Sequence, residues 1–182
     1  MSRKGLTVRD LTMIGVSTAL LVLCTMFLKI QGPTGMIHFG SAALFTVAAV
    51  FGGVYAALAG ALGSLIFDLL GGQLSYTIWS FFIKGIAGLV VGAIACGIFP
   101  DTRPDAGRRF SRVLLGCLAG MVVTAVGYFF AWWQVIGDVR VAFANIYMYS
   151  LPTSVIGTIT ACAIAVPLYR ALDKSGFFGK NQ

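Results

Sequence analysis

Residues 55–70, YAALAGALGSLIFDLL, decide the fold class. The run is apolar up to its single charge, Asp68, and it approaches the roughly 20 residues that a helix needs to span a bilayer. Ala56, Gly60 and Ser64 are spaced by four and therefore share one helix face. Small residues on such a face let a neighbouring membrane helix approach closely. The stretch therefore predicts a membrane-spanning helix that packs tightly against another.

Five further apolar runs flank this one, and the chain as a whole has the same character. The runs cover residues 11–28, 39–51, 76–99, 113–133 and 142–172. The run at 39–51 is short for a span, and we expect Pro152 to divide the long last run because proline interrupts helical hydrogen bonding. We predict an all-α integral membrane protein, a six-transmembrane-helix bundle that forms a single domain over residues 1–182.

The composition excludes a soluble protein and a nucleic-acid-binding protein. Hydrophobic residues make up 58% of the chain and charged residues 10%, against roughly 25% charged residues in soluble domains. The mean hydropathy is +0.91. The net charge of +7 comes mainly from basic residues that flank the apolar runs, which is the positive-inside pattern of membrane proteins. We therefore expect a lipid bilayer and no nucleic acid as a partner.

The same basic clusters predict the topology. They lie near both ends of the chain and between residues 100 and 112. Six spans place both termini on one side of the membrane, and positive charge favours the cytoplasm. We expect cytoplasmic tails at 1–10 and 173–182 and a cytoplasmic loop at 100–112, whereas the loops at 29–38, 71–75 and 134–141 face outside.

Two small-residue stripes end in a charge inside the membrane. The stripe through Gly60 continues to Asp68, and one step of four before Gly88 leads to Lys84. A charge in the middle of a membrane helix costs about 2.5–3.5 kcal/mol on insertion scales, so it is paired, hydrated or functional. Two interpretations remain open: a structural ion pair between Asp68 and Lys84, or a lysine that also contacts a polar or anionic ligand.

The expected outer ends of the helices are rich in aromatic and polar side chains. An interfacial aromatic belt explains some of the Trp and Tyr residues, but not the convergence of His38, Lys84 and Asn145 on one side. Aromatic walls with a few directed polar groups suit a flat heterocycle. A metal site is not expected, because His38 has no second histidine or cysteine beside it. The candidate ligand-binding residues are His38, Tyr76, Trp79, Lys84, Trp132, Trp133, Asn145 and Tyr149.

The first apolar run carries its own pair of small residues, Gly15 and Ala19, spaced by four. Such a pair can serve packing inside the bundle or docking onto a partner membrane protein. Both interpretations remain open for this helix.

Three segments resemble the substrate-binding S components of energy-coupling-factor (ECF) vitamin transporters. They are IHFGS at 37–41, VFGGVYAALAGALGS at 50–64 and FIKGIAGL at 82–89. The last is similar to the start of helix four in the branch of hydroxymethylpyrimidine, pyridoxine and riboflavin-type carriers. That branch often has Asp at the position of Ser41.

The resemblance implies a high-affinity binding subunit for uptake of a small vitamin or precursor across a prokaryotic cell (inner or plasma) membrane. Because the expected binding site has few charges, it favours the small neutral heterocycles pyridoxine and hydroxymethylpyrimidine. The family further implies a separate module, with a membrane T component that Gly15 and Ala19 meet and two ATPases. ATP is then used only by these partner subunits, and no covalently bound cofactor and no enzymatic activity are expected.

Two alternatives belong to other classes of membrane protein. An intramembrane enzyme would need a nucleophile or metal cluster, but His38 has no evident serine partner and the aspartates are scattered. A channel or structural subunit is the other alternative, although the sequence has no ring of charge or filter-like motif.

The topology can be tested by cysteine labelling. In a chain whose own cysteines are replaced, Asp105→Cys should resist a membrane-impermeant thiol reagent in intact cells and react after permeabilisation. Asp138→Cys, in the loop expected outside, is the matched control and should react in intact cells. Labelling at 105 from outside would overturn the predicted orientation.

Overall fold

The computed structural model describes residues 7–98 and 110–175. The helices within these ranges are α1 (Val8–Phe27), α2 (Gly40–Phe51), α3 (Gly53–Leu70), α4 (Thr77–Ala95), α5 (Phe110–Ile136), α6 (Val139–Asn145) and α7 (Leu151–Lys174). A short 3-10 helix (Leu74–Tyr76) precedes α4, and a π-helical turn (Ile146–Ser150) joins α6 to α7. Two short strands, β1 (Lys29–Gln31) and β2 (Met36–His38), pair antiparallel with Lys29 opposite His38.

The helical membrane bundle predicted from the sequence is confirmed. Five helical stretches of the described chain are long and apolar enough to cross a membrane: 8–27, 53–70, 74–95, 110–136 and 139–172. The sixth apolar run forms the shorter helix α2. The β1–β2 hairpin was not expected from the sequence.

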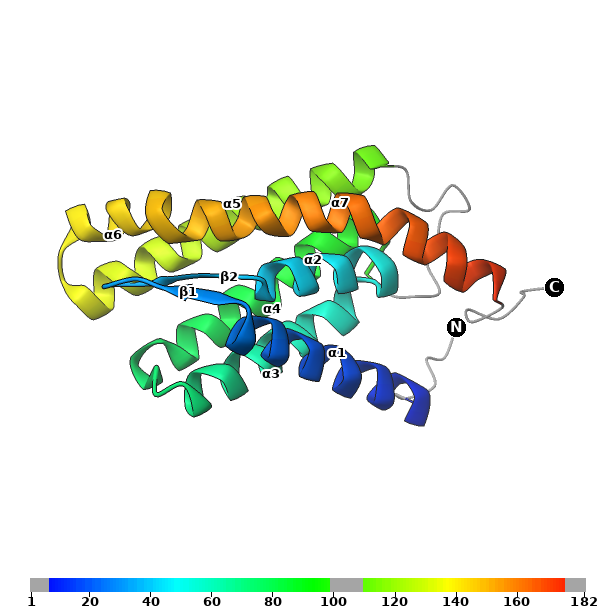
Figure 1. Ribbon diagram of the computed structural model, residues 1–182, viewed down its shortest axis with the longest axis horizontal. Coiled ribbons are helices and arrows are strands. Elements are labelled where there is room, and N and C mark those ends of the chain that lie inside the picture. Colours follow the sequence, from blue (N-terminus) through cyan, green and yellow to red (C-terminus); the bar gives the residue numbers. More distant parts are fainter. Residues whose placement is uncertain (1–6, 99–109, 176–182) are drawn as a thin grey trace.

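The start of α1 and the end of α7 lie at the same end of the bundle (Figure 1). The beginnings of α1 and α5 and the ends of α4 and α7 lie there, while the hairpin and the α3–α4 and α5–α6 turns lie at the other end. We call the latter the hairpin end. This arrangement agrees with an even number of crossings. Most of the tails at 1–10 and 173–182 and of the loop at 100–112 lies outside the described residues, and their cytoplasmic location stays a prediction.

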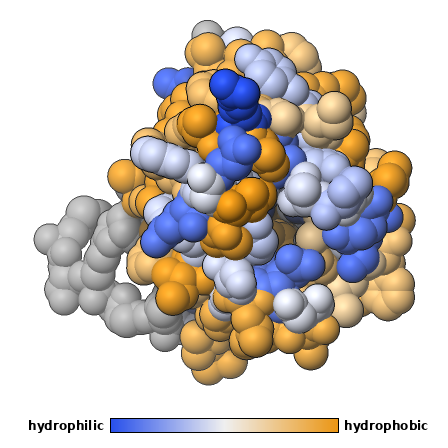
Figure 2. Space-filling model, turned by 90° about the vertical axis from the view of Figure 1, so that its left-hand side faces the viewer, coloured by the Kyte–Doolittle hydropathy of each residue, from blue (hydrophilic) through white to orange (hydrophobic). Residues whose placement is uncertain are grey.

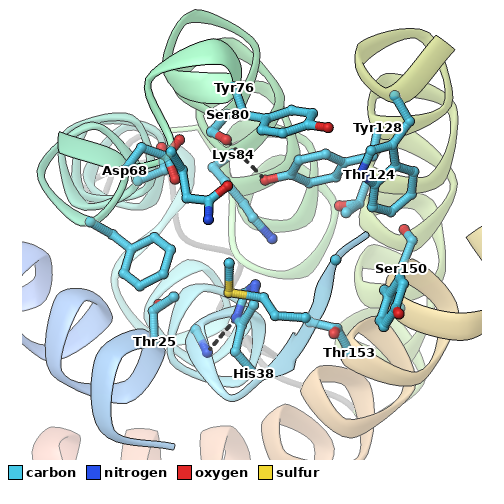
Figure 3. A pocket seen from close by; sticks show the side chains of 18 of the residues that line it. Thr25, His38, Asp68, Tyr76, Ser80, Lys84, Thr124, Tyr128, Ser150 and Thr153 are labelled. Atoms are coloured by element: carbon cyan, nitrogen blue, oxygen red, sulfur yellow. Dashed lines mark hydrogen bonds between the residues drawn. The ribbon is translucent and has the colours of Figure 1, made fainter. Parts of the chain in front are cut away.

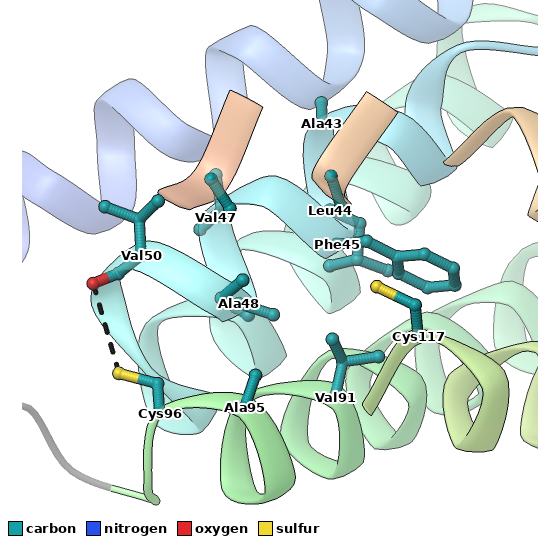
Figure 4. Packing of buried hydrophobic residues seen from close by; sticks show 14 of the residues in the cluster. Ala43, Leu44, Phe45, Val47, Ala48, Val50, Val91, Ala95, Cys96 and Cys117 are labelled. Carbon is teal, nitrogen blue, oxygen red and sulfur yellow. Dashed lines mark hydrogen bonds between the residues drawn. The ribbon is translucent and has the colours of Figure 1, made fainter. Parts of the chain in front are cut away.

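Helix α2 forms the centre of the core. Ten of its twelve residues are buried, and Leu44, Phe45 and Val50 have no exposed surface. Figure 4 shows these side chains among residues of α4 and α5, with Cys117 near Phe45. Because α1, α3, α4, α5 and α7 all contact α2, it meets protein rather than lipid. Its length is therefore not constrained by the thickness of the bilayer.

Helices α3 and α4 approach each other at glycine. A Cβ added at Gly60 would lie 2.7 Å from the carbonyl oxygen of Lys84, and one at Gly88 would lie 2.7 Å from the backbone of Ala56. Leu44 of α2 packs against the same two glycines. These stripes therefore serve internal packing, whereas a Cβ at Gly15 of α1 would meet nothing within 4 Å.

The expected break at Pro152 is wrong. Pro152 lies in the first turn of α7, and the helical path is continuous through the π-helical turn before it. In that turn the N–H of Leu151 bonds to the carbonyl of Ile146, five residues back. A proline ring clashes with the carbonyl four residues earlier and has no N–H to donate. The wider π-helical turn accommodates both effects without ending the helix.

The glycine contact between α3 and α4 should be essential for stability. Gly60→Val and Gly88→Val should each lower the free energy of unfolding by about 1–3 kcal/mol. The added atoms would collide with the backbone of the neighbouring helix, which cannot move away without disturbing the bundle. Gly15→Val is the matched control and should leave the stability nearly unchanged. Thermal unfolding of the purified protein in detergent measures the difference, and equal melting temperatures for all three variants would contradict the packing.

Candidate functional site

A cavity of about 380 Å³ lies at the hairpin end of the bundle. Its walls come from the hairpin, α1, α3, α4, α5, the π-helical turn and the start of α7. Figure 2 views the molecule from the hairpin end and shows hydrophilic residues grouped among apolar ones. The cavity is thus a chamber lined by both polar and apolar side chains.

The structure brings together five of the eight residues that the sequence nominated as ligand-binding. His38, Tyr76, Lys84, Trp132 and Tyr149 line the cavity. That they contact a ligand stays a prediction.

The other three nominated residues lie elsewhere. Trp79 borders a separate surface recess with Gln134, and Trp133 is 47% exposed and packs on Phe129. Both positions suit an interfacial aromatic belt, the alternative that the sequence left open. Asn145 is buried and holds the hairpin, because its Oδ1 accepts a 2.6 Å hydrogen bond from Thr34 Oγ1.

Lys84 projects from α4 into the cavity (Figure 3). The residue is only 5% exposed. Its Nζ donates a 2.9 Å hydrogen bond to Ser41 Oγ of α2 and lies 5.5 Å from the centre of the Tyr128 ring. Both partners are uncharged. The ammonium group therefore has a hydrogen bond and a cation–π contact, but no anionic neighbour at bonding distance.

Asp68 lines the same cavity from α3 and is 4% exposed. Its carboxyl group lies beside Ser80, whose Oγ accepts a 3.4 Å hydrogen bond from Tyr128. Oδ2 of Asp68 is buried without a hydrogen-bond partner. A buried polar atom of this kind costs about 1–3 kcal/mol until a partner is supplied.

The direct Asp68–Lys84 ion pair expected from the sequence is not formed. Within the described residues no carboxylate oxygen lies within 4.0 Å of Lys84 Nζ. The two groups are close enough to interact electrostatically, but Lys84 is directed to Ser41 and Asp68 to Ser80. The stripe pattern placed both residues on facing helices correctly, whereas the direction of each side chain depends on α2 and α5.

His38 ends β2 and presents a defined hydrogen-bonding group to the cavity. Its Nδ1 accepts a 3.1 Å hydrogen bond from the N–H of Gly40, so the ring proton lies on Nε2. Loss of hydration and the positive charges of Lys84 and Lys29 lower the pKa of His38 to about 3. The imidazole is thus neutral at physiological pH and offers one N–H donor.

The hairpin is fastened over the cavity by the π-helical turn. A Cβ added at Gly32 or Gly35 would collide with the Tyr149 ring, so only glycine allows this ring to pack against the hairpin backbone. Together with the hydrogen bond from Thr34 to Asn145, this contact ties the hairpin to the segment before α7. π-Helical turns often mark functional sites, and here the turn directs Tyr149 to the hairpin and to the cavity lining.

Several cavity residues were not nominated from the sequence. Ser150 Oγ and Thr153 Oγ1 are buried without partners, and nothing in the pattern singled them out. Others continue the stripes by steps of four: Thr124 and Tyr128 follow Gly120, and Ser80 precedes Lys84. The same extension that located Asp68 would have found them. The residues in this group are Ser80, Thr124, Tyr128, Ser150 and Thr153.

Gly15 and Ala19 of α1 do not line this cavity. Both are exposed on α1, and the space beside Gly15 is open. The pair is therefore not used for packing within the described part of the chain, and docking onto a partner membrane protein stays a prediction.

Comparison with known proteins agrees with this architecture. The sequence profile of the family described as "ECF-type riboflavin transporter, S component" matches residues 5–174. A protein of Pyrococcus woesei, described as an uncharacterized protein in the gap 3′ region, is 32% identical over 109 residues. This alignment covers 57% of the chain and 65% of that protein, which is slightly less than two thirds of its length.

Two solved structures share the fold at low sequence identity. The crystal structure of FolT bound with folic acid is 17% identical and superposes with a TM-score of 0.69 over 91% of this chain and 95% of that one. An S component of a bacterial ECF transporter, also 17% identical, gives a TM-score of 0.62 over 92% and 96%. At this identity the likeness establishes the fold alone.

Proposed function

The chain belongs to the ECF-type riboflavin transporter S component family, and from this premise we propose that it is the high-affinity binding subunit for uptake of a small vitamin or vitamin precursor. The family consists of multi-pass proteins of the prokaryotic plasma membrane, in agreement with the apolar helices. Because its members are transporter subunits, the alternatives of an intramembrane enzyme and a channel are set aside.

One observation carries the proposal: the chamber at the hairpin end holds buried polar groups that lack partners. Asp68 Oδ2, Ser150 Oγ and Thr153 Oγ1 are unpaired, and Lys84 and His38 retain N–H donors. Buried polar groups are normally satisfied. A small polar ligand would supply the missing hydrogen bonds, and the aromatic rings of Tyr76, Tyr128 and Trp132 would cover its flat faces.

For the ligand we favour a one-ring heterocycle of the pyridoxine or hydroxymethylpyrimidine type. The cavity volume of about 380 Å³ lies at the low end of the roughly 300–1,000 Å³ of small-molecule pockets. The description of the matching family makes riboflavin the second candidate.

For the partners we propose a T component and two ATPases that supply the energy. Gly15 and Ala19 would form the docking surface for the T component. Their support is the exposed position of both residues on α1 and the open space beside Gly15, since small residues let two membrane helices approach closely.

Ligand binding can be tested by thermal unfolding of the purified protein with pyridoxine, hydroxymethylpyrimidine, riboflavin and folic acid. A ligand at 100 times its dissociation constant should stabilise the protein by about 2.7 kcal/mol. We expect this with a one-ring vitamin and not with folic acid. If none of the four changed the melting temperature, the proposed binding function would be contradicted.

The docking surface can be tested separately from binding. Gly15→Leu and Ala19→Leu should abolish vitamin uptake in cells while the isolated protein binds its ligand with unchanged affinity, because both residues lie away from the cavity. Ala163→Leu, the same change at an exposed position of α7, is the control and should retain uptake. Loss of binding together with uptake would argue against a docking role.

A further inference from the structure

We propose that the ligand is a dipolar heterocycle, which places an acidic oxygen against Lys84 and a ring N–H against Asp68, and that Ser41 sets this preference. The inference rests on the proposed vitamin-binding function and narrows its ligand. It assigns to Ser41 a role in specificity through Lys84, without contact to the ligand.

The first observation is that the charge of Lys84 is not neutralised. Its hydrogen-bond partner is the hydroxyl of Ser41 at 2.9 Å, and its other neighbour is the ring of Tyr128. No carboxylate oxygen of the described chain comes within 4.0 Å. Since an unpaired charge at membrane depth is costly, an anionic oxygen of a ligand would be stabilised at this position. A hydrogen bond to a charged group changes an affinity roughly tenfold to hundredfold.

The second observation is that Asp68 lacks a hydrogen-bond donor on one oxygen of its carboxyl group. Ser80 occupies one side of its carboxyl group, and Oδ2 is buried with no partner. A carboxylate can only accept hydrogen bonds, so this atom requires a donor from the cavity. An N–H group of a ligand, and best a protonated ring nitrogen, meets that requirement.

Both groups belong to one wall and face one chamber. Asp68 of α3 and Lys84 of α4 line the same cavity, and Figure 3 shows the lysine amine projecting toward its centre with the aspartate to one side. A purely anionic ligand would satisfy Lys84 and repel Asp68, whereas a neutral ligand without an acidic oxygen would leave the ammonium group unpaired. A ligand with both charges satisfies both groups.

This requirement distinguishes the two favoured ligands. The 3-hydroxypyridine ring of pyridoxine has an acidic oxygen and a basic nitrogen, and it exists in water as a dipolar form with both charged. Hydroxymethylpyrimidine has ring nitrogens and an amino group but no acidic oxygen. The cavity is therefore built for the hydroxypyridine type.

Because Ser41 is uncharged, it leaves the ammonium group of Lys84 free to pair with an anionic group of the ligand. It is fully buried at the first turn of α2, and α7 fixes its place, because a Cβ at Gly157 would lie 3.0 Å from the Ser41 backbone. A carboxylate at this position would reach the ammonium group and neutralise it. The serine hydroxyl orients Lys84 by one hydrogen bond and adds no charge.

Two variants test the inference by isothermal titration with pyridoxine and with hydroxymethylpyrimidine as probes. Ser41→Asp neutralises Lys84 with an internal carboxylate, and Lys84→Gln removes the charge but keeps a donor. Each should weaken pyridoxine binding roughly tenfold to hundredfold. Ser41→Asp should keep or raise the melting temperature, because the new carboxylate pairs with the buried ammonium group of Lys84. Lys84→Gln should lower it, because the buried Asp68 loses the positive charge with which it interacts. Ser75→Asp adds the same carboxylate at an exposed position outside this cavity and serves as the control.

The expected result also includes tighter binding of pyridoxine than of hydroxymethylpyrimidine by the unaltered protein, by roughly tenfold or more. Wild-type affinity for pyridoxine in either folded variant would overturn the inference. So would equal or tighter binding of hydroxymethylpyrimidine or riboflavin by the unaltered protein, and in that case the vitamin-binding function would still stand. Absence of binding to every vitamin would refute both.

Discussion

The contact that the rest of the structure depends on is the close approach of α3 and α4 at Gly60. A Cβ at that position would press on the carbonyl oxygen of Lys84, so the absence of a side chain on one helix sets the place of the charged residue on the other. In a membrane, van der Waals packing of this kind replaces the hydrophobic drive that assembles soluble helices. Asp68, two turns further along α3, consequently lies on the wall that Lys84 shares.

The chamber exists because the helices differ in length. Helix α2 is surrounded by protein and spans only Gly40–Phe51, so the hairpin before it can fold over the space that a full-length helix would fill. The π-helical turn before α7 has the complementary effect. It directs Tyr149 against the glycines of the hairpin and leaves Ser150 at the cavity. Tyr149 and Ser150 of this turn border the cavity, and irregular backbone is tolerated in membrane proteins where it lines a cavity.

Electrostatics then gives the chamber its chemical character. In a direct ion pair, Asp68 and Lys84 would neutralise each other, and the cavity would offer no charged group to a ligand. Instead the neutral hydroxyls of Ser41 and Ser80 orient Lys84 and Asp68 and leave each with unused bonding capacity. Retaining separated charges in a buried site is unfavourable without a ligand. A site of this kind is thereby suited to tight binding, because the ligand relieves a cost that the protein bears when empty.

Apolar runs, basic flanks and steps of four in the sequence were sufficient to determine the helical membrane bundle, the packing faces of α3 and α4 and the presence of Asp68 and Lys84 at one site. These features follow from bilayer thickness and helix periodicity, which are local properties of the chain. Tertiary structure alone decided the hairpin, the π-helical turn near Pro152, the outward place of Trp79 and Trp133 and the hydroxyl that Lys84 bonds. Each of these depends on which distant segment occupies the neighbouring space, such as Ser41 of α2 beside Lys84 of α4, and periodicity within one helix carries no information about that neighbour.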